Sequence, residues 1–316
     1  MSAESFVFGI ELDGNGGGKP ISEMTAVNHA HWLHLDYSRQ DITAVLDNLY
    51  IDSNAQESLL RLDTRPRAIV TTNYIILLLR GVNTNPGADP EDMVSLRLYI
   101  EENRVISLRQ RKLFSAQDAR QDIESGRGAH NIAELVLSLI EKMTDRVESF
   151  VVDLDEKMEI VEDAIQQKAA ISRGDITILR RQAATVKRFM SPQRDALEAL
   201  QRQASQWFDA ATLFQLREQS DRITRYVEDL DLLRERTQLL QEELMNQLAQ
   251  QQNSRVYLLS IITTIFLPIS FLTGLFGMNV AGLPGTDNAN AFMIMVASML
   301  SISFITVLLL KYNRWF

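Results

Sequence analysis

The chain has 316 residues and carries 32 Lys and Arg against 41 Asp and Glu, a formal charge of −9. This net negative charge argues against a general nucleic-acid-binding protein. The sequence contains no cysteine, which excludes a disulfide framework, a cysteine-ligated metal site and a thiol nucleophile. Residues 256–316 hold only three charged side chains, net +1, so residues 1–255 carry −10. The two regions are therefore suited to different solvents.

The first 111 residues have the mixed pattern of an α/β fold, with short apolar runs separated by turn residues. The predicted elements are strands over 6–12 and 68–79, a short helix over 41–49, and a β-hairpin of 94–100 with 104–109.

From Ser115 onward the pattern is helical. Apolar residues recur in steps of three and four over 131–167, which predicts one helix with a single buried stripe. Gly174 interrupts the following segment. Ser191 and Pro192 then predict the start of a new helix, with Ser191 as its N-cap and Pro192 in its first turn.

The last soluble helix is predicted to begin near Asp209 and has no Gly or Pro until Pro268. Its apolar positions repeat at coiled-coil spacing, at Ile223, Tyr226, Leu230, Leu233, Thr237, Leu240 and Leu244. One copy of such a helix cannot bury this seam alone. We expect partner helices from its own chain, from other copies of the chain, or from both.

Two C-terminal runs predict membrane-spanning helices. Residues 256–276 are 21 uncharged residues and residues 291–310 are 20, and 21 residues in a helix measure roughly 31 Å, the thickness of the bilayer core. The alternative, a buried helix of a soluble core, is disfavoured because such a helix rarely lacks a charged face at this length.

The charges that flank the two runs predict the topology. Arg255 precedes the first run, Lys311 and Arg314 follow the second, and the 14-residue loop 277–290 has no Lys or Arg. Cationic flanks stay in the cytoplasm, so both termini are expected inside. Because the N-terminus lacks the basic and apolar regions of a signal peptide, residues 1–255 are expected to be cytosolic.

One face of the first run is small and polar. At about 100° per residue its members fall within about 120° of one another: Asn253, Val256, Ser260, Thr263, Leu267, Ser270, Gly274 and Gly277. Two interpretations remain open from this pattern. Small residues allow tight packing of membrane helices, and a ring of several copies would turn the same face into a channel wall.

Three other motifs favour structural interpretations. The glycine-rich stretch 13–19 resembles a phosphate-binding loop, but Pro20 stands where Ser or Thr is required, so a turn is favoured. His29, His31 and His34 suggest a zinc site, but in a strand His34 lies on the opposite face from the other two, and no fourth ligand has useful spacing.

An acidic run marks the predicted helix over 131–167, at Glu148, Asp153, Asp155, Glu156, Glu159, Glu162 and Asp163. A solvated helix face is favoured over a divalent-cation sensor. No nucleophile with a suitable base stands out, so the sequence gives no support for an enzyme.

The end of the first span carries a family resemblance. Gly277-Met278-Asn279, followed by a short loop and one last helix, resembles the signature of the CorA-type divalent-cation transporters. The continuation over 280–285 (VAGLPG) and the segments 79–83 (LRGVN) and 85–95 (NPGADPEDMVS) resemble the ZntB zinc-transporter branch of that family. Phe276 replaces the Tyr that is common before the motif, which removes a hydroxyl.

The resemblance implies a homopentamer in the bacterial inner membrane, with no cofactor. Each chain would have a funnel-forming α/β/α domain (1–208), a stalk helix (209–255), a pore-lining span (256–276), an outer loop (277–290), an outer span (291–310) and a cytosolic tail (311–316). Gly277, Met278 and Asn279 would form the outer mouth. The small polar face would become the pore wall, with Asn253 as an inner polar ring.

The chemistry of the spans does not choose the transported ion. A dehydrated Zn²⁺ prefers His, Cys or carboxylate ligands, but from Val256 onward Asp287 is the sole residue of these types. The ion is therefore expected to keep most of its water shell, and neutral oxygens suit hydrated Mg²⁺ equally well. The preference for Zn²⁺ over Mg²⁺, Co²⁺ or Ni²⁺ rests on the resemblance.

Proton coupling would need a titratable group outside the spans, since neither span has a carboxylate or histidine. Candidates are Asp287, Glu242, Glu243 and the N-terminal histidines. Uptake driven by the membrane potential alone remains open, because 100 mV contributes about 4.6 kcal/mol for a divalent ion.

Two other functions remain as alternatives. The same architecture could conduct Mg²⁺, Co²⁺ or Ni²⁺ as a CorA-type channel. A membrane-anchored sensor with a coiled-coil stalk belongs to a different class, but it would have no reason to carry hydroxyls and glycines along one face of the span.

Overall fold

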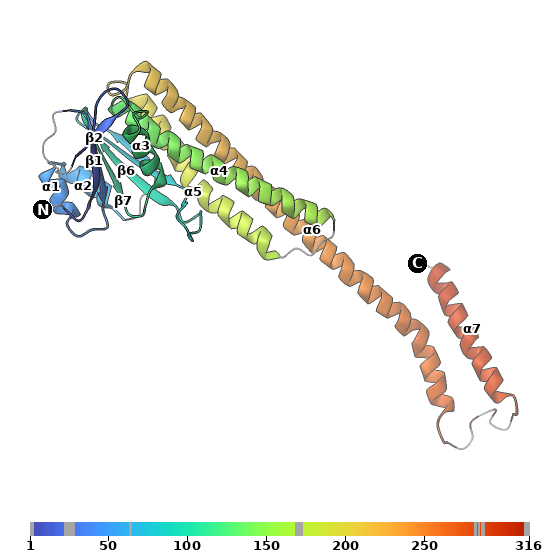
Figure 1. Cartoon of the computed structure of the whole chain (residues 1–316). Coiled ribbons are helices and arrows are strands. Elements are labelled where there is room, and N and C mark those ends of the chain that lie inside the picture. Colours follow the sequence, from blue (N-terminus) through green and yellow to red (C-terminus); the bar gives the residue numbers. More distant parts are fainter. Residues whose placement is uncertain are drawn as a thin grey trace. The chain divides into compact units, whose positions relative to one another are not determined.

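The computed structural model describes residues 3–21, 29–62, 65–167, 173–280, 283, 285 and 288–312. Its chain forms two compact units, Met1–Gln241 and Glu242–Phe316. The first unit contains a seven-stranded sheet in the order β2-β1-β3-β7-β6-β5-β4 (Figure 1). Neighbouring strands are antiparallel except β3 and β7, which are parallel. The strands are β1 (Phe6–Leu12), β2 (Gly18–Ile21), β3 (His31–Asp36), β4 (Arg67–Val70), β5 (Ile75–Gly81), β6 (Val94–Ile100) and β7 (Arg104–Arg109).

Helices cover both faces of this sheet (Figure 1). One face is covered by α1 (Ile42–Asn48) and α2 (Ser53–Leu60), and the other by α3 (Phe114–Glu124), α4 (Ile132–Gln166), α5 (Arg173–Gln203) and the N-terminal part of α6 (Ala210–Phe276). The second unit holds the rest of α6 and α7 (Ala291–Tyr312). The predicted α/β/α fold with a long helix and a C-terminal apolar helix is confirmed.

Strand β5 is apolar and buried over Ile75–Leu79, because both faces of the sheet are covered there. In β5, Leu77 and Leu79 face the core under α4, whereas Ile76 and Leu78 face the core under α1 and α2. Successive strand residues point to opposite faces, so this single run of leucines and isoleucines supplies both cores.

The prediction of one strand over 68–79 is wrong. β4 ends at Val70 and β5 begins at Ile75, and the two pair antiparallel as a hairpin. Thr71 makes the turn, because its hydroxyl donates to the Tyr74 carbonyl oxygen (2.7 Å) and accepts from the Tyr74 amide (3.0 Å). A threonine can form such a local turn even inside a β-forming run.

The prediction that Ser191 and Pro192 begin a helix is also wrong. α5 runs through Pro192 without ending. Proline removes one helical hydrogen bond, but buried residues on both sides, including Met190 and Leu197, hold the helix on the core. Gln193 adds a further tether, since its Oε1 accepts from the Arg80 amide on β5 at 2.7 Å.

The predicted seam of α6 is buried within its own chain. Its first five members are buried, and Leu240 packs against the same core as α4 and α5. Partner helices of the same chain therefore cover the seam between residues 223 and 240.

Ion pairs reinforce the contact between α4 and α6. Arg222 pairs with Asp145 and Glu148 of α4, and Arg236 pairs with Asp155 (2.6 Å) and Glu162 (2.8 Å). Three members of the acidic run thus serve as partners for arginines on α6. The prediction of a solvated acidic face is therefore incomplete.

Candidate functional site

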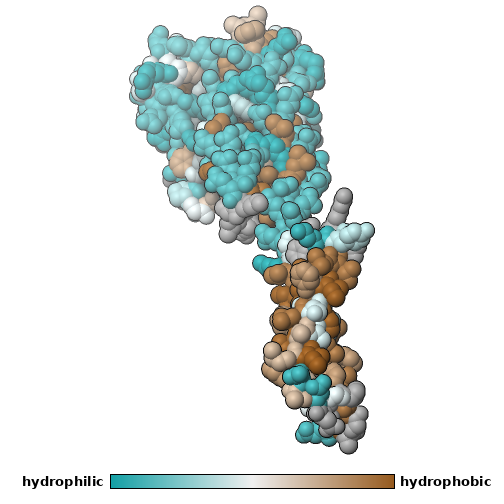
Figure 2. All heavy atoms as spheres, turned by 90° about the vertical axis from the view of Figure 1, so that its right-hand side faces the viewer, coloured by the Kyte–Doolittle hydropathy of each residue, from teal (hydrophilic) through white to brown (hydrophobic). Residues whose placement is uncertain are grey.

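Two helices are long and apolar enough to cross a membrane, α6 in its C-terminal part and α7. In the most apolar 18-residue segment of each helix, only 0 % (α6) and 6 % (α7) of the segment is buried. Figure 2 shows the corresponding apolar surface over the second unit, in contrast to the largely hydrophilic first unit. Such a surface requires an apolar environment outside the chain.

Within the second unit each helix has one partly shielded stripe. On α6 it comprises Ile261, Ile265, Pro268, Ile269 and Leu272, with Ser260 partly shielded at its edge, and on α7 it comprises Ala291, Met295, Met299, Ile302, Ser303, Thr306 and Leu310. Most members of each stripe follow one another in steps of three or four residues, so each stripe occupies one face of its helix.

The small polar face of α6 lies on the other side of the helix. At about 100° per residue, the face that begins at Asn253 is centred roughly opposite the partly shielded stripe of α6. Val256 and Leu267 on this face are 55 % and 67 % exposed, and a Cβ at Gly274 would meet nothing within 4 Å. The predicted pore wall is thus largely exposed within the chain and is available to other molecules.

Hydroxyl groups on this face keep their hydrogens within the helix. Ser260 Oγ donates to the Val256 carbonyl oxygen (2.9 Å), and Thr263 Oγ1 donates to the Leu259 carbonyl oxygen (2.8 Å). Because a hydroxyl has one donor and two acceptor lone pairs, these oxygens are left as acceptors. An acceptor surface suits the water molecules around a cation.

Helix α6 ends at the predicted outer mouth. The Gly277 amide donates to the Thr273 carbonyl oxygen at 2.9 Å, and Met278 and Asn279 follow in an irregular, exposed segment. Asn279 therefore carries its side-chain amide directly after the end of the helix. No feature of the sequence marks Thr273 as the partner of Gly277, because a backbone acceptor leaves no trace in residue type.

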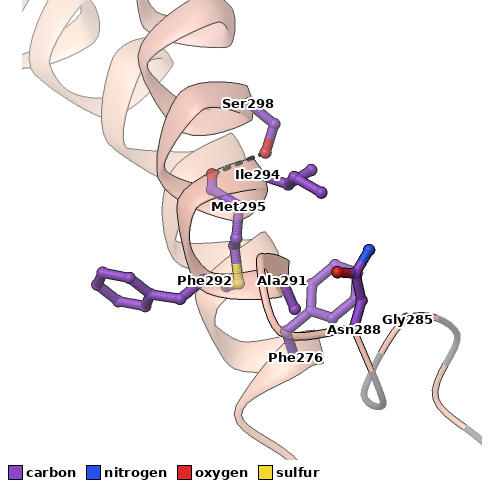
Figure 3. A pocket seen from close by; sticks show the side chains of 8 residues that line it. All are labelled: Phe276, Gly285, Asn288, Ala291, Phe292, Ile294, Met295 and Ser298. Atoms are coloured by element: carbon purple, nitrogen blue, oxygen red, sulfur yellow. Dashed lines mark hydrogen bonds between the residues drawn. The ribbon is translucent and has the colours of Figure 1, made fainter.

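A cavity of about 390 Å³ lies near this end of the hairpin. Figure 3 shows its lining, which is mainly apolar and comes from the end of α6, the loop and the start of α7. Its polar groups are engaged locally: Asn288 Oδ1 accepts from the Asn290 amide (2.9 Å), and Ser298 Oγ donates to the Met295 carbonyl oxygen (2.8 Å). This lining is unsuited to a metal cation.

The N-terminal histidines do not form a metal site. Across the described residues, no three His, Asp or Glu side chains come together in a metal-binding arrangement. Trp32 Nε1 and His34 Nδ1 both contact Ser107 Oγ, at 2.6 and 2.7 Å, inside the core under α4. His31 instead bonds the His29 carbonyl oxygen through Nδ1 (2.8 Å). Burial, together with Arg109 and Arg120, lowers the pKa of His34 to about 3, so it is neutral at physiological pH.

The glycine-rich stretch is a turn. Asp13 Oδ1 accepts from the amides of Asn15 (2.8 Å) and Gly17 (2.9 Å), so a carboxylate occupies the position that a phosphate would need. These hydrogen bonds lower the pKa of Asp13. Of the suggested proton carriers, Glu242 and Glu243 are exposed on α6, and Asp287 lies outside the described residues.

Comparison with known proteins identifies the family. The sequence model for the CorA-like Mg²⁺ transporter protein family matches residues 27–312. The chain belongs to this family. Members transport divalent cations across membranes, so the chain is a membrane transporter and not an enzyme, as the sequence predicted.

Relatives within the CorA-like family carry more specific names. The chain is 38 % identical to the divalent cation transporter CmaX of Pseudomonas aeruginosa over 296 residues, covering 90 % of this chain and 89 % of that protein. It is 32 % identical to the zinc transport protein ZntB of Yersinia enterocolitica over 322 residues, covering 100 % and 97 %. The solved structure of full-length CmaX matches with a TM-score of 0.87 at 34 % identity and covers all of both chains. The predicted resemblance to CorA-type and ZntB transporters is confirmed.

Proposed function

We propose that this chain forms a homopentameric transporter that moves Zn²⁺ across the bacterial inner membrane. The observation that carries the proposal is the largely exposed polar face of α6, which leads to Asn279 at the helix end. Similarity to a zinc transport protein along the whole chain supports the choice of ion.

In this proposal five copies of α6 surround the pathway. Val256, Ser260, Thr263, Leu267, Ser270 and Gly274 line it, Asn253 forms an inner polar ring, and Gly277, Met278 and Asn279 form the outer mouth. The Asn279 amides would present neutral oxygens to the water shell of an arriving cation. Hydroxyl oxygens of Ser260 and Thr263 then accept hydrogen bonds from that shell, since their own hydrogens are used within the helix.

The proposed topology keeps both termini in the cytoplasm. Residues 1–208 form the cytosolic domain, 209–255 the stalk, 256–276 the inner span, 277–290 the outer loop, 291–310 the outer span and 311–316 the tail. The cationic flanks Arg255 and Lys311 support this orientation. An inward-negative membrane potential then favours cation entry, and coupling to protons would require a carrier outside the spans.

A CorA-type channel for Mg²⁺, Co²⁺ or Ni²⁺ is the second candidate, favoured by the lack of zinc-type ligands in the spans. The pore proposal is tested with Asn279→Ala and Asn279→Asp in proteoliposomes. Both variants should keep the pentameric mass in detergent, and Asn279→Ala should lower the Zn²⁺ flux. Unchanged flux through an intact Asn279→Ala oligomer would show that Asn279 does not form the ion entrance.

A further inference from the structure

A second cavity lies in the first unit, remote in sequence from the spans. Its volume is about 700 Å³, within the range of small-molecule sites in proteins. Two turns, the Thr71–Tyr74 turn and the β6–β7 turn, meet the N-terminus of α4 and the α5–α6 connection around it. Nothing in the proposed transport pathway uses this crevice.

An aromatic wall of the crevice is held in a fixed orientation. Trp207 Nε1 donates to the Thr71 carbonyl oxygen at 3.1 Å, and the indole packs partly against the main core. Gln206 Nε2 reaches the same carbonyl oxygen at 3.3 Å. The half-buried Trp207 ring is therefore positioned before any ligand arrives, and Ala133 with the exposed edges of Ile132 and Phe208 supplies apolar lining beside it.

The charged side chains in the lining of the crevice are acidic. Its lining contains Glu101 and Glu102 and, among the described residues, no Lys, Arg or His side chain. Glu101 is engaged by Arg104 Nε (2.6 Å) and by the Tyr99 hydroxyl (3.1 Å). Glu102 is exposed in the turn and makes no ion pair within the described part of the chain, so its carboxylate is available.

The helix terminus at the crevice does not reverse this charge. Asn131 caps α4 by accepting from the Glu134 amide (2.9 Å), and Glu134 accepts from the His130 amide (2.9 Å). Partial burial opposes ionisation of Glu134, but the hydrogen bonds from His130 and Asn131 lower its pKa. A carboxylate thus already compensates the positive end of the helix.

We propose that this crevice binds a small organic cation, a protonated amine attached to a compact apolar body. Trp207 provides a π-surface for the ammonium group, Glu102 provides its counter-charge, and Ile132, Ala133 and Phe208 receive the apolar body. The chain would then have a ligand site for an amine separate from its metal pathway.

The experiment uses the full chain in detergent with three probes that share one body and differ in charge: 2-phenylethylammonium, 2-phenylethanol and phenylacetate. Dissociation constants are measured by ligand-observed NMR. The ammonium probe should bind about three- to fivefold more tightly than the alcohol, as expected for one exposed ion pair. Phenylacetate should bind most weakly.

Two variants locate the site. Glu102→Gln should abolish the preference for the ammonium probe over the alcohol, whereas Glu57→Gln, which removes an exposed carboxylate from α2, should leave it unchanged. Trp207→Leu should weaken both probes. If Trp207→Leu does not fold, Glu102→Gln still decides, because Glu102 is an exposed turn residue. Equal affinity for the three probes, or a charge preference that survives Glu102→Gln, would overturn the proposal.

Discussion

The Gly277 amide donates to the Thr273 carbonyl oxygen at 2.9 Å, and a Cβ atom on residue 277 would lie 2.7 Å from that same oxygen. A carbon cannot approach a carbonyl oxygen so closely without displacing the backbone. Glycine at this position therefore allows the chain to leave the helix immediately before Met278 and Asn279. The geometry of the proposed mouth depends on glycine having no Cβ atom at position 277.

Gly277→Ala should shift the end of α6 and lower metal flux in proteoliposomes while the first unit stays folded. Gly274→Ala adds the same methyl group to the proposed pore wall, where it would meet nothing within 4 Å of its own chain, so this variant measures the effect of a methyl group in the pathway without displacement of the helix end. Relative to glycine, alanine stabilises a helix interior by about 1 kcal/mol. Equal flux in Gly277→Ala and the wild type would mean that the helix end tolerates the displacement.

Sequence patterns predict the strands of this fold best where turn residues mark the strand ends. The strands over 6–12, 94–100 and 104–109 match β1, β6 and β7, because turn residues bound them. The strand over 68–79 was predicted undivided because the local hydrogen bonds of Thr71 do not change its β-forming composition. The sequence also gave no indication of α2, which Asp52 caps by accepting from the amides of Asn54 and Ala55.

The candidate pore wall could be predicted from the sequence only in part. Helical geometry alone places the spaced set that begins with Asn253 and ends with Gly277 on one face of α6, so the candidate pore wall could be defined from the sequence. The exposure of that face within the second unit could not be predicted, because it depends on which side chains pack against α6. The apolar seam that begins at Ile223 likewise predicts a helical partner without identifying it. In the structure, α4 and α5 cover this seam.

Arg236→Gln should lower the free energy of unfolding of the first unit by about 1 kcal/mol, because Arg236 pairs with both Asp155 and Glu162 from a partly buried position. Urea unfolding of the full chain in detergent measures this change. Arg217→Gln is the control, since its pair with Asp221 spans 3.9 Å and is largely exposed. Equal effects of the two variants would contradict a specific role for the α4–α6 ion pairs.

Acid should destabilise the first unit through His34. Burial lowers its folded-state pKa to about 3, below the ordinary value of about 6.5. Between these two values the unfolded chain binds a proton that the folded chain does not, so stability falls as the pH falls below about 6.5. Lowering the pH from 7 to 5 should cost about 2 kcal/mol.

The variant that tests this origin is His34→Gln, which should reduce the loss of stability between pH 7 and 5 in urea unfolding. His29→Gln replaces an exposed histidine and should keep the wild-type dependence. A wild-type slope in His34→Gln would assign the acid sensitivity to other groups.

Carboxylates on the α4–α6 contact should act at lower pH. Hydrogen bonds from Tyr226 and Arg222 lower the pKa of Glu148 in the folded chain. The contribution of Glu148 to stability is therefore complete above its pKa in the unfolded chain and is lost as the pH falls through its pKa in the folded chain. Arg222→Gln should therefore weaken the fall in stability below about pH 4.5. An identical acid limb in Arg222→Gln and the wild type would exclude this ion pair as its cause.

The most direct measurement of the central claim is ion uptake by proteoliposomes that contain the full chain. Zn²⁺ and Mg²⁺ are compared with and without an imposed pH gradient, under a fixed membrane potential. We predict Zn²⁺ flux above that of empty liposomes and above the Mg²⁺ flux, and a response to the gradient would add proton coupling. Preferred Mg²⁺ flux would contradict the zinc assignment and favour a CorA-type channel, and no flux of either ion would contradict divalent-cation transport by this chain.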